Sequence, residues 1–390
     1  MKSKLGQYFT TNKQLQECLY SFILNSIETS KILEPSCGRG DLVEYILSKN
    51  SFAQFDLYEI DKSIKKLPSL LHIDITYTDF LQENNENKYN IIVGNPPFIR
   101  TRKGNTYIDF TRKCFDMLNQ NGELIFIVPS DMFKLTSASS LLNDMMREGC
   151  FTHIYHPNNE NLFSNASIDV MIFRYCKNNN LPKSTLFNDK EKRILNSNGI
   201  ITFEELNSIE EDKCILSDHF NVHVGMVSGK DDIYKSEELG NIKLLNGNNK
   251  HNRFIYIKES PNEEDNKELY EYMMTHKSAL LNRRIRSFTE ENWFEWGAPR
   301  NVSIIEQHWG DRCIYMNNLT RKAEVCFSGE VEYFSGGLIM MRPKRMFDLK
   351  RIVDYLNSDE FKKNFMFSGR FKIGHKQLCN SRVPRSLFVV

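Results

Sequence analysis

The segment IIVGNPPF at residues 91–98 joins a candidate buried strand to residues that could orient an amine. The side-chain oxygen of Asn95 and the carbonyl oxygen of Pro96 can accept the two N–H groups of a planar amine, and the prolines hold that carbonyl in place. Phe98 can stack on a base that has left its duplex. Together these groups would direct the nitrogen lone pair toward an electrophile without a strong general base. The alternative is an ordinary Gly-Pro turn with Phe98 in the core.

Glycines and a carboxylate follow the first candidate strand, in LEPSCGRGD at residues 33–41. In a doubly wound fold this turn brings a ligand close to the backbone, and Gly38 and Gly40 lack the Cβ that would collide with it. Glu34 ends the strand and would lie beside the ligand. The G-x-G-x-x-G pattern of a pyrophosphate-binding fold is absent, and glycine turns with a purely structural role are more common than ligand sites.

The next two strands also end in residues suited to a nucleoside. Glu59, in FDLYEID at residues 55–61, could accept both hydroxyls of a ribose, while Asp61 would cap the following helix. In the sequence TDF, Asp79 could accept an exocyclic amine and Phe80 could lie against an adenine face. Each residue taken alone would be ordinary surface or core, but three such strand ends around one crevice predict a nucleoside-binding site.

These residues must be positioned by short aliphatic runs that alternate with amphipathic segments from residue 31 onward. Such alternation predicts an α/β fold of the Rossmann-like kind, a mostly parallel sheet with helices on both faces. Two further strands, at 151–157 and 167–177, have no helix between them and predict a hairpin at one sheet edge. The other expected elements are strands at 31–35, 55–61, 72–78, 89–95 and 122–130 and helices at 40–50, 61–71 and 106–118.

The alternation stops near residue 178. The polar stretch at 177–199 predicts a linker or irregular crossing, and beyond it Gly, Trp and Tyr become denser. We therefore expect a first domain at 1–178, a linker at 179–210 and a second domain of α+β character at 211–390. We also expect the tryptophans of the second domain to lie mostly in its core.

The composition indicates a globular protein without an obvious charge signal. Lys and Arg number 51 against 50 Asp and Glu in 390 residues, so net charge does not point to a nucleic-acid partner. The nine cysteines lack metal-ligand spacing, which predicts reduced thiols and no metal site. No signal peptide and no uncharged run of eighteen apolar residues is present. These features predict a soluble, intracellular protein without a membrane partner, in a cytoplasm or in a host nucleus or virus factory.

Six segments resemble, in order and in similar spacing, the gamma class of adenine-N6 DNA methyltransferases. They are GQYFT (6–10), LEPSCGRGD, LYEID, TDF, GNPPF and LFSNASIDVMIFRY (162–175). The resemblance covers roughly residues 4–176. It implies a class I methyltransferase domain that transfers the methyl group of S-adenosylmethionine to the N6 amine of a flipped adenine in duplex DNA.

The resemblance also implies roles for individual residues. Asn95, Pro96 and Phe98 would hold the target adenine, and Phe163 would pack against its other face. Phe98 stands where Tyr is more common, which preserves stacking, and Asp169 replaces a residue that is often small, without an evident reason. The residues implied to bind the cofactor are Gln7, Tyr8, Phe9, Thr10, Glu34, Pro35, Gly38, Gly40, Glu59, Ile60, Asp79, Phe80 and Asn95.

The second domain is expected to recognise double-stranded DNA. HVGMVSGKDDIYK at 223–235 resembles the opening of a target-recognition domain, and NRRIRSFTE at 282–290 would form a phosphate-contacting helix face. Residues 361–390 carry seven Lys or Arg and no acidic residue, and four interleaved phenylalanines predict that this stretch is folded. The candidate DNA-binding residues are Lys230, Arg283, Arg284, Arg286, Arg370, Lys372, His375 and Lys376.

Three alternatives stay open at this stage. Similar N-x-P-F motifs occur in methyltransferases of release-factor glutamines and of ribosomal RNA bases, because a planar amide and an aminopurine present similar groups to Asn95. A degenerate, non-catalytic DNA-binding protein is the third. Methyltransferases of release-factor glutamines typically carry their extra domain before the catalytic domain. Here the extra domain follows it, which favours DNA as the substrate. We expect a monomer that acts with a separate cognate restriction endonuclease and has no fused nuclease.

Overall fold

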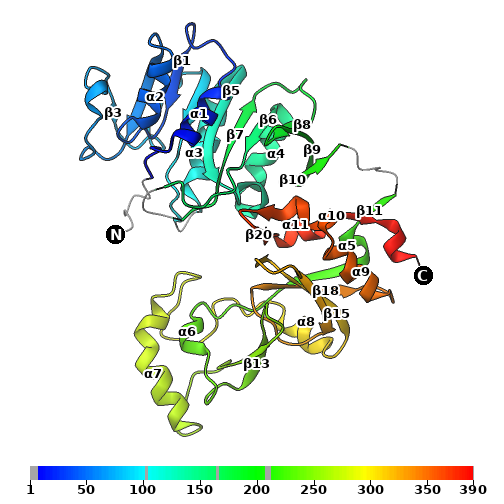
Figure 1. Cartoon of the computed structure of the whole chain (residues 1–390). Helices are drawn as coiled ribbons and strands as arrows, with labels where there is room; N and C mark the ends of the chain where they lie inside the picture. Colours follow the sequence, from blue (N-terminus) through cyan, green and yellow to red (C-terminus); the bar gives the residue numbers. More distant parts are fainter. Residues whose placement is uncertain (1–7, 102–103, 164–166, 207–211, 390) are drawn as a thin grey trace. The chain divides into compact units, whose positions relative to one another are not determined.

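The computed structural model describes residues 8–101, 104–163, 167–206 and 212–389. The chain divides into two compact units, Met1–Ser208 and Ile209–Val390, and each is described by itself (Figure 1). The first unit is an α/β sandwich around one large sheet. The second is an α+β unit built on smaller antiparallel sheets.

The first unit contains a ten-stranded sheet in the order β10-β9-β8-β6-β7-β5-β4-β1-β2-β3. Strands β3, β2, β1, β4 and β5 run parallel to one another, whereas β7 lies antiparallel between β5 and β6. The strands are β1 (Lys31–Glu34), β2 (Gln54–Glu59), β3 (Thr76–Tyr77), β4 (Tyr89–Gly94), β5 (Leu118–Pro129), β6 (Cys150–Tyr155), β7 (Val170–Cys176), β8 (Ser184–Phe187), β9 (Lys190–Ser197) and β10 (Ile200–Glu205).

Helices cover both faces of this sheet, as the sequence predicts. Successive residues of β4 point to opposite faces, so Ile91 and Val93 join one core and Ile92 joins the other. The first core includes α1 and α2, and the second includes α3 and α4. The bounds are α1 (Lys13–Ser21), α2 (Asp41–Lys49), α3 (Thr106–Asp116) and α4 (Ser139–Glu148), with 3₁₀ turns η1 (Pro68–Leu70), η2 (Met132–Lys134) and η3 (Thr136–Ala138).

The predicted helix at 61–71 is wrong. Only the 3₁₀ turn η1 forms there, because Pro68 has no N–H to donate to a preceding turn. Asp61 therefore caps no helix; its carboxylate accepts the N–H of Ser63 instead. The strand expected at 72–78 is reduced to the two residues of β3.

The predicted linker at 179–210 is also wrong over most of its length, and the hairpin of β6 and β7 is not at the sheet edge. Strands β8, β9 and β10 continue the sheet beyond β6. Two-residue turns join them, Asn188-Asp189 and Asn198-Gly199, and all four residues have positive φ. Asn-Gly is a strong hairpin signal, since its residues tolerate that conformation, and the polar composition concealed it.

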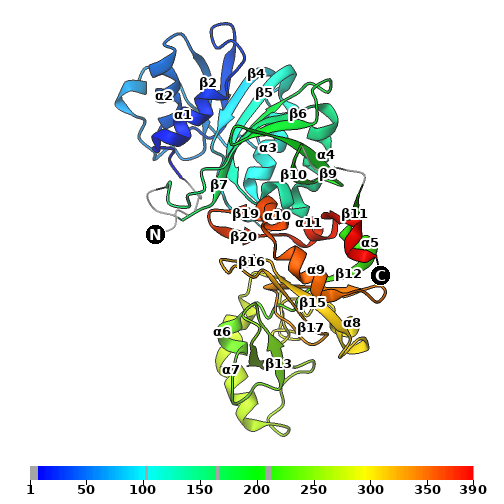
Figure 2. The same cartoon turned by 45° about the vertical axis from the view of Figure 1, so that its right-hand side comes forward.

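The second unit centres on a four-stranded antiparallel sheet in the order β12-β18-β15-β17, visible in Figure 2. Its strands are β11 (Lys213–Ile215), β12 (Phe220–Val224), β13 (Ile242–Leu245), β14 (His251–Phe254), β15 (Arg312–Asn317), β16 (Leu319–Thr320), β17 (Cys326–Glu330), β18 (Leu338–Pro343), β19 (Met366–Phe367), β20 (Arg370–Lys372) and β21 (Arg382–Pro384). Its helices are α5 (Leu216–His219), α6 (Asp231–Tyr234), α7 (Lys267–Leu281), α8 (Val302–Gln307), α9 (Leu349–Leu356), α10 (Asp359–Lys362) and α11 (His375–Cys379), with 3₁₀ turns η4 (Lys363–Phe365) and η5 (Arg385–Phe388).

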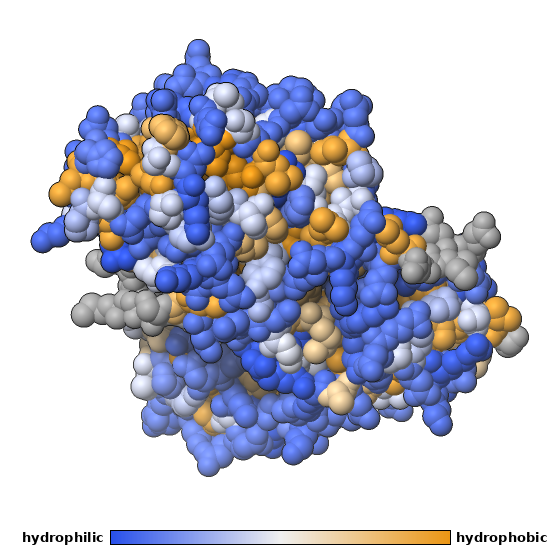
Figure 3. All heavy atoms as spheres, turned by 45° about the horizontal axis from the view of Figure 1, so that its top comes forward, coloured by the Kyte–Doolittle hydropathy of each residue, from blue (hydrophilic) through white to orange (hydrophobic). Residues whose placement is uncertain are grey.

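The aromatic residues of the second unit lie largely in its cores. Trp293 and Trp296 are buried, whereas Trp309 is exposed, so the expectation for the tryptophans is confirmed for two of the three. Phe361 and Phe371 are also buried, which confirms that the basic C-terminal stretch is folded. Hydrophilic residues predominate on the face shown in Figure 3. Over the described ranges, no helix combines the length and apolarity needed to cross a membrane.

Candidate active site

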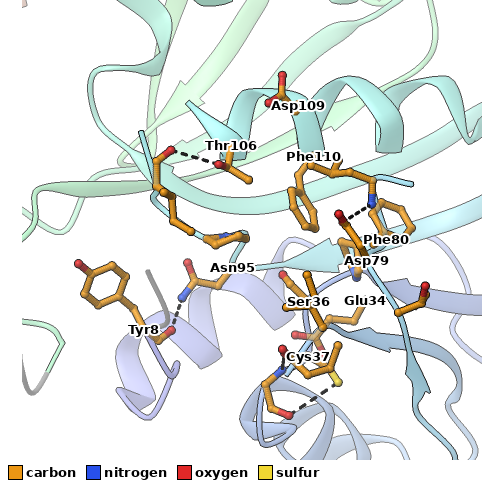
Figure 4. Close-up of a pocket in the computed structure, with 18 of the residues that line it drawn as sticks. Tyr8, Glu34, Ser36, Cys37, Asp79, Phe80, Asn95, Thr106, Asp109 and Phe110 are labelled. Carbon is orange, nitrogen blue, oxygen red and sulfur yellow. Dashed lines mark hydrogen bonds between the residues drawn. The ribbon is translucent and has the colours of Figure 1, made fainter. Parts of the chain in front are cut away.

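A cavity of about 560 Å³ lies where β1, β2 and β4 end, a volume typical of small-molecule sites. Parallel strands bring their carboxyl ends to one edge of the sheet, which is why residues from distant segments meet there (Figure 4). The sequence-predicted residues that line it are Tyr8, Phe9, Thr10, Glu34, Pro35, Gly38, Glu59, Ile60, Asp79, Phe80 and Asn95. Lining residues that sequence reasoning missed include Ser36, Cys37, Asp41, Thr106, Asp109 and Phe110.

Among the described residues predicted to bind the cofactor or the target base, four do not line this cavity. Gly40 has φ of 94° at the start of α2, and a Cβ there would lie 2.3 Å from the side chain of Leu70, so this glycine is required by packing. Pro96, Phe98 and Phe163 lie outside the lining. Gln7 falls outside the described residues.

Glu59 joins the end of β2 to the glycine turn after β1. Its carboxylate accepts the N–H of Gly38 at 2.9 Å through one oxygen and the N–H of Asp61 at 2.9 Å through the other. Gly38 has φ of 56°, and a Cβ there would lie 3.1 Å from the ring of Phe9. The positive φ and this tight contact favour glycine in the turn, and each carboxylate oxygen of Glu59 keeps a lone pair for a hydroxyl.

Glu34 is a buried carboxyl group at the end of β1, and 2% of its surface is exposed. Burial raises its pKa to about 8, and repulsion from Asp41 and Glu59 adds to that shift. Within the described part of the chain, neither Glu34 Oε2 nor Ser36 Oγ has a hydrogen-bond partner, although both atoms are buried. Buried polar atoms without partners are costly, so this end of the cavity suits a ligand with an amino group.

Asp79 and Phe80 begin a single turn that follows β3. The N–H of Leu81 donates to Asp79 Oδ1 at 3.0 Å, and Asp79 keeps its second oxygen for another donor. The ring of Phe80 stacks on that of Phe110, with centroids 5.6 Å apart and planes 26° apart. Phe110 belongs to the apolar face of α3, and that periodicity alone gave no reason to assign it to a site.

Asn95 has one half of its amide satisfied and the other half unsatisfied. Its Nδ2 donates to the carbonyl oxygen of Tyr8 at 2.8 Å (Figure 4) and to the hydroxyl of Thr10 at 3.0 Å. Its Oδ1 is buried and accepts no hydrogen bond from the described residues. The two bonds to Nδ2 fix the orientation of the amide, so the arrangement presents an acceptor beside the cavity.

Three aromatic rings group beside Asn95. The centroid of Tyr8 lies 5.6 Å from that of Phe98 and 5.6 Å from that of Phe163, and the last two lie 6.5 Å apart. Phe98 is half-buried and Phe163 is buried. The structure therefore brings Phe163 to the NPPF segment from about 65 residues away in the sequence.

Asp169 has a structural explanation. One carboxylate oxygen lies 3.0 Å from Nε2 of the buried His156, and the other accepts the hydroxyl of Ser130. The N–H of Ser130 also donates to the carbonyl oxygen of Asp169 at 2.9 Å. Asp169 thus ties the end of β5 to the start of β7 and to the segment after β6.

The prediction that Arg283 contacts phosphate is wrong. The segment 282–290 is not helical, because α7 ends at Leu281. Arg283 is 7% exposed, and its guanidinium donates to the carbonyl oxygens of Leu280, Ser228 and Trp293 at 2.8, 2.9 and 2.6 Å. It also lies 3.7 Å above the ring of Phe288. These contacts stabilise the fold of the second unit.

The other candidate DNA-binding residues differ in exposure. Arg286 pairs with Glu295 at 2.5 Å, and Lys230 lies 3.3 Å from Asp232. The ring of His375 contacts the carbonyl oxygen of Val222 at 3.1 Å. Arg370 and Lys372 are half-buried on β20, whereas Arg284 and Lys376 are exposed. No group of three His, Cys, Asp or Glu side chains in the described ranges could hold a metal ion.

Comparison with known proteins shows that the first unit is similar to restriction-modification methylases. Residues 43–163 match the family described as Eco57I restriction-modification methylase. The Type II methyltransferase M.HincII of Haemophilus influenzae is 26% identical over 226 residues, which cover 52% of this chain and 43% of that protein. The modification methylase CviBIII of Paramecium bursaria Chlorella virus NC1A is 34% identical over 148 residues, or 33% of this chain and 39% of that protein.

A solved structure of the Type IIL restriction-modification enzyme MmeI in complex with DNA is similar over 94% of this chain and 63% of that chain, with a TM-score of 0.51 and 11% identity. The resemblance to restriction-modification methyltransferases and the expected α/β fold are thus confirmed. The chain spans less than half the length of the curated relatives named above.

Proposed function

We propose that this protein is a site-specific DNA methyltransferase that transfers the methyl group of S-adenosylmethionine to the N6 amine of a flipped adenine in duplex DNA. The observation that carries the proposal is the orientation of Asn95, whose Oδ1 is a buried acceptor without a partner among the described residues, beside a nucleoside-sized cavity. The match of residues 43–163 to a restriction-modification methylase family supports it.

The residues around the cavity fit S-adenosylmethionine. Glu34 and Ser36 offer buried polar atoms to the amino-acid portion, Glu59 offers acceptors to the ribose, and Asp79 with Phe80 would bind the adenine. The bound cofactor supplies a methyl group made electrophilic by its attachment to a sulfonium. Phe9, which is 37% exposed and packs against Gly38, would cover one side of the site with Tyr8 and Thr10.

Asn95 and Pro96 would align the target amine. Since Nδ2 of Asn95 is held by Tyr8 and Thr10, its Oδ1 can accept one amine N–H without reorienting, and the carbonyl oxygen of Pro96 would accept the second. These two acceptors leave the nitrogen lone pair directed at the methyl carbon. Holding two reactants in line can lower a barrier by about 7 to 11 kcal/mol, so no covalent intermediate is required.

Phe98 and Phe163 would hold the extruded base. Stacking on an aromatic ring stabilises a base that has lost its duplex neighbours by about 1–3 kcal/mol. The two rings already lie with Tyr8 in one aromatic group beside Asn95.

We assign the first unit to catalysis and the second to recognition of DNA. The exposed Arg284 and Lys376 would contact phosphates, and further candidates are Lys230, Arg370, Lys372 and His375. A separate cognate endonuclease would complete the system.

The test is methyl incorporation from labelled S-adenosylmethionine into unmodified genomic DNA, followed by sequencing that reports methylated adenines. The wild type should methylate adenine in one sequence context, and Asn95→Ala should lose at least about 1000-fold in rate while its cofactor affinity changes little. Asn25→Ala is the matched control, because Asn25 Nδ2 also donates to two oxygens, the carbonyls of Asn90 and Asn121, and Asn25 does not line the cavity.

Transfer to structured RNA but not to DNA would assign the enzyme to RNA bases. Cofactor binding without transfer to any nucleic acid would favour a non-catalytic DNA-binding protein. Undiminished turnover in Asn95→Ala would remove Asn95 from the mechanism.

A further inference from the structure

The turn that carries Asp79 is an incomplete helical turn. The N–H groups of Gln82 and Glu83 donate to the carbonyl oxygen of Asp79 at 2.9 and 3.2 Å, and the Asp79 side chain caps Leu81. The N–H of Glu83 is shared with the carbonyl oxygen of Phe80 at 3.3 Å, a longer contact, and no helix follows to supply the donors of a next turn. A turn of this kind needs stabilisation from elsewhere in the fold if it is to keep one conformation.

Lys113 of α3 supplies that stabilisation. Its ammonium donates to the carbonyl oxygen of Phe80 and, at 2.6 Å, to that of Glu83. It also lies 4.5 Å from the centroid of the Phe80 ring, a distance at which a cation is attracted to an aromatic face. One side chain therefore contacts both ends of the turn and the ring that it carries.

We propose that Lys113 is a positioning residue that sets the selectivity of the cofactor site for adenine. It fixes the turn 79–83, so that the free oxygen of Asp79 meets the exocyclic amine and the Phe80 ring keeps its place against Phe110. Lys113 does not line the cavity and acts only through these residues. The inference rests on the proposed function, since it assigns the cavity to a ligand that contains adenine.

The chemistry of Lys113 suits this role. Its position is half-buried, and burial lowers its pKa, while the nearby carboxylates of Glu83 and Asp79 act in the opposite direction. An ammonium has three donors, so it can satisfy two carbonyls and still face a ring. A neutral side chain of similar length, such as Met, would fill the space and lose all of these contacts.

Lys177 provides a matched control within the same unit. Its ammonium lies 4.7 Å from the centroid of the Phe115 ring and 3.5 Å from the carbonyl oxygen of Phe115. It also lies 3.5 Å from the carboxylate of Glu148, and it does not line the cavity. Lys177→Met removes a similar lysine–phenylalanine contact at a site that the proposal gives no role.

The experiment measures, by calorimetry, the affinity of the full chain for S-adenosylhomocysteine and for its hypoxanthine analogue, in which oxygen replaces the exocyclic amine. The wild type should prefer the adenine ligand by at least about 10-fold, because the oxygen would face the Asp79 acceptor. Lys113→Met should reduce this preference to less than about threefold. Lys113→Arg, which retains charge and donors, and Lys177→Met should both preserve it. Thermal unfolding of each variant reports whether it is folded.

A Lys113→Met variant that keeps the wild-type preference would overturn the proposal, and so would a Lys177→Met variant that loses it equally. If Lys113→Met does not fold, Lys113→Gln replaces it, and an unchanged preference there has the same meaning. A wild type that binds both ligands equally would also overturn the proposal. That result would not bear on methyl transfer, which the incorporation assay tests separately. A wild type that binds neither ligand would contradict the proposed function itself.

Discussion

The carboxyl ends of the strands in the first unit and the basic loops of the second unit differ in how well their residues could be assigned. Glu34, Glu59 and Asn95 all line one cavity, as their positions at the carboxyl ends of three strands predict. Arg283 and Arg284 are neighbours in the sequence, yet the first is buried and the second is exposed. A parallel sheet places every strand end at one edge, whereas a loop imposes no comparable constraint on its side chains.

The largest expected effect tests the residues at the strand ends of the first unit. Glu59→Gln should lower the affinity for S-adenosylhomocysteine by at least about 100-fold, or roughly 3 kcal/mol, because an NH2 group replaces one of the two acceptor oxygens and faces a backbone N–H and a ribose hydroxyl that both need an acceptor. Calorimetric titration would measure the change. The exposed Glu86 provides the control Glu86→Gln, and equal affinity of the Glu59 and Glu86 variants would show that Glu59 is only structural.

The second effect separates the two arginines by stability. Arg283→Ala should lower the free energy of unfolding by about 2 kcal/mol, because three buried carbonyls lose their donor. Arg284→Ala should change it little. Denaturant unfolding of both variants would measure this, and equal stabilities would mean that the contacts of Arg283 contribute nothing net.

A smaller effect concerns pH. The pKa of Glu34 is raised to about 8 in the folded protein from 4.5, so between these values the folded state binds more protons than the unfolded state. Stability should therefore fall as pH rises through this window, by about 1.4 kcal/mol per pH unit at most from this group. Glu34→Gln should remove that part of the slope in denaturant unfolding between pH 5 and about 8. A slope unaffected by the substitution would show that Glu34 titrates normally.

The smallest effect returns to the exposed arginine. Arg284→Ala should reduce the dependence of DNA affinity on salt by about one unit of log–log slope, with similar loss on all DNA sequences, as expected for a single phosphate contact. Arg312, also exposed in the second unit, provides the comparison Arg312→Ala. The assignment of Arg284 would be wrong if its variant kept the wild-type slope.

The fold of the first unit was largely predictable up to β7, because its strands are continuous aliphatic runs and its helices have clear apolar periodicity. The prediction was wrong where composition hid the pattern. Strand β9 is mostly polar and Ile194 is its buried residue, whereas the apolar start of β10 at Ile200 and Ile201 is short and follows a polar stretch. The two-residue turns at Asn188 and Asn198 were the available signal.

The contacts that complete the site were less accessible from sequence. Phe110 comes from α3 and reaches the cavity only through the packing of that helix on the sheet. The bonds from Asn95 to Tyr8 and Thr10 join segments more than 80 residues apart. Asp169 likewise gained an explanation only when His156 and Ser130 were placed beside it.

The three added strands also decide where this protein can be divided. Residue 178 lies between β7 and β8. A fragment that ends there would lack β8, so β6 (Cys150–Tyr155) would become an edge strand with unpaired backbone groups. An unpaired border of this kind is a template for strands of other molecules. A fragment of residues 1–178 should therefore self-associate, and one that extends through Glu205 should stay dispersed.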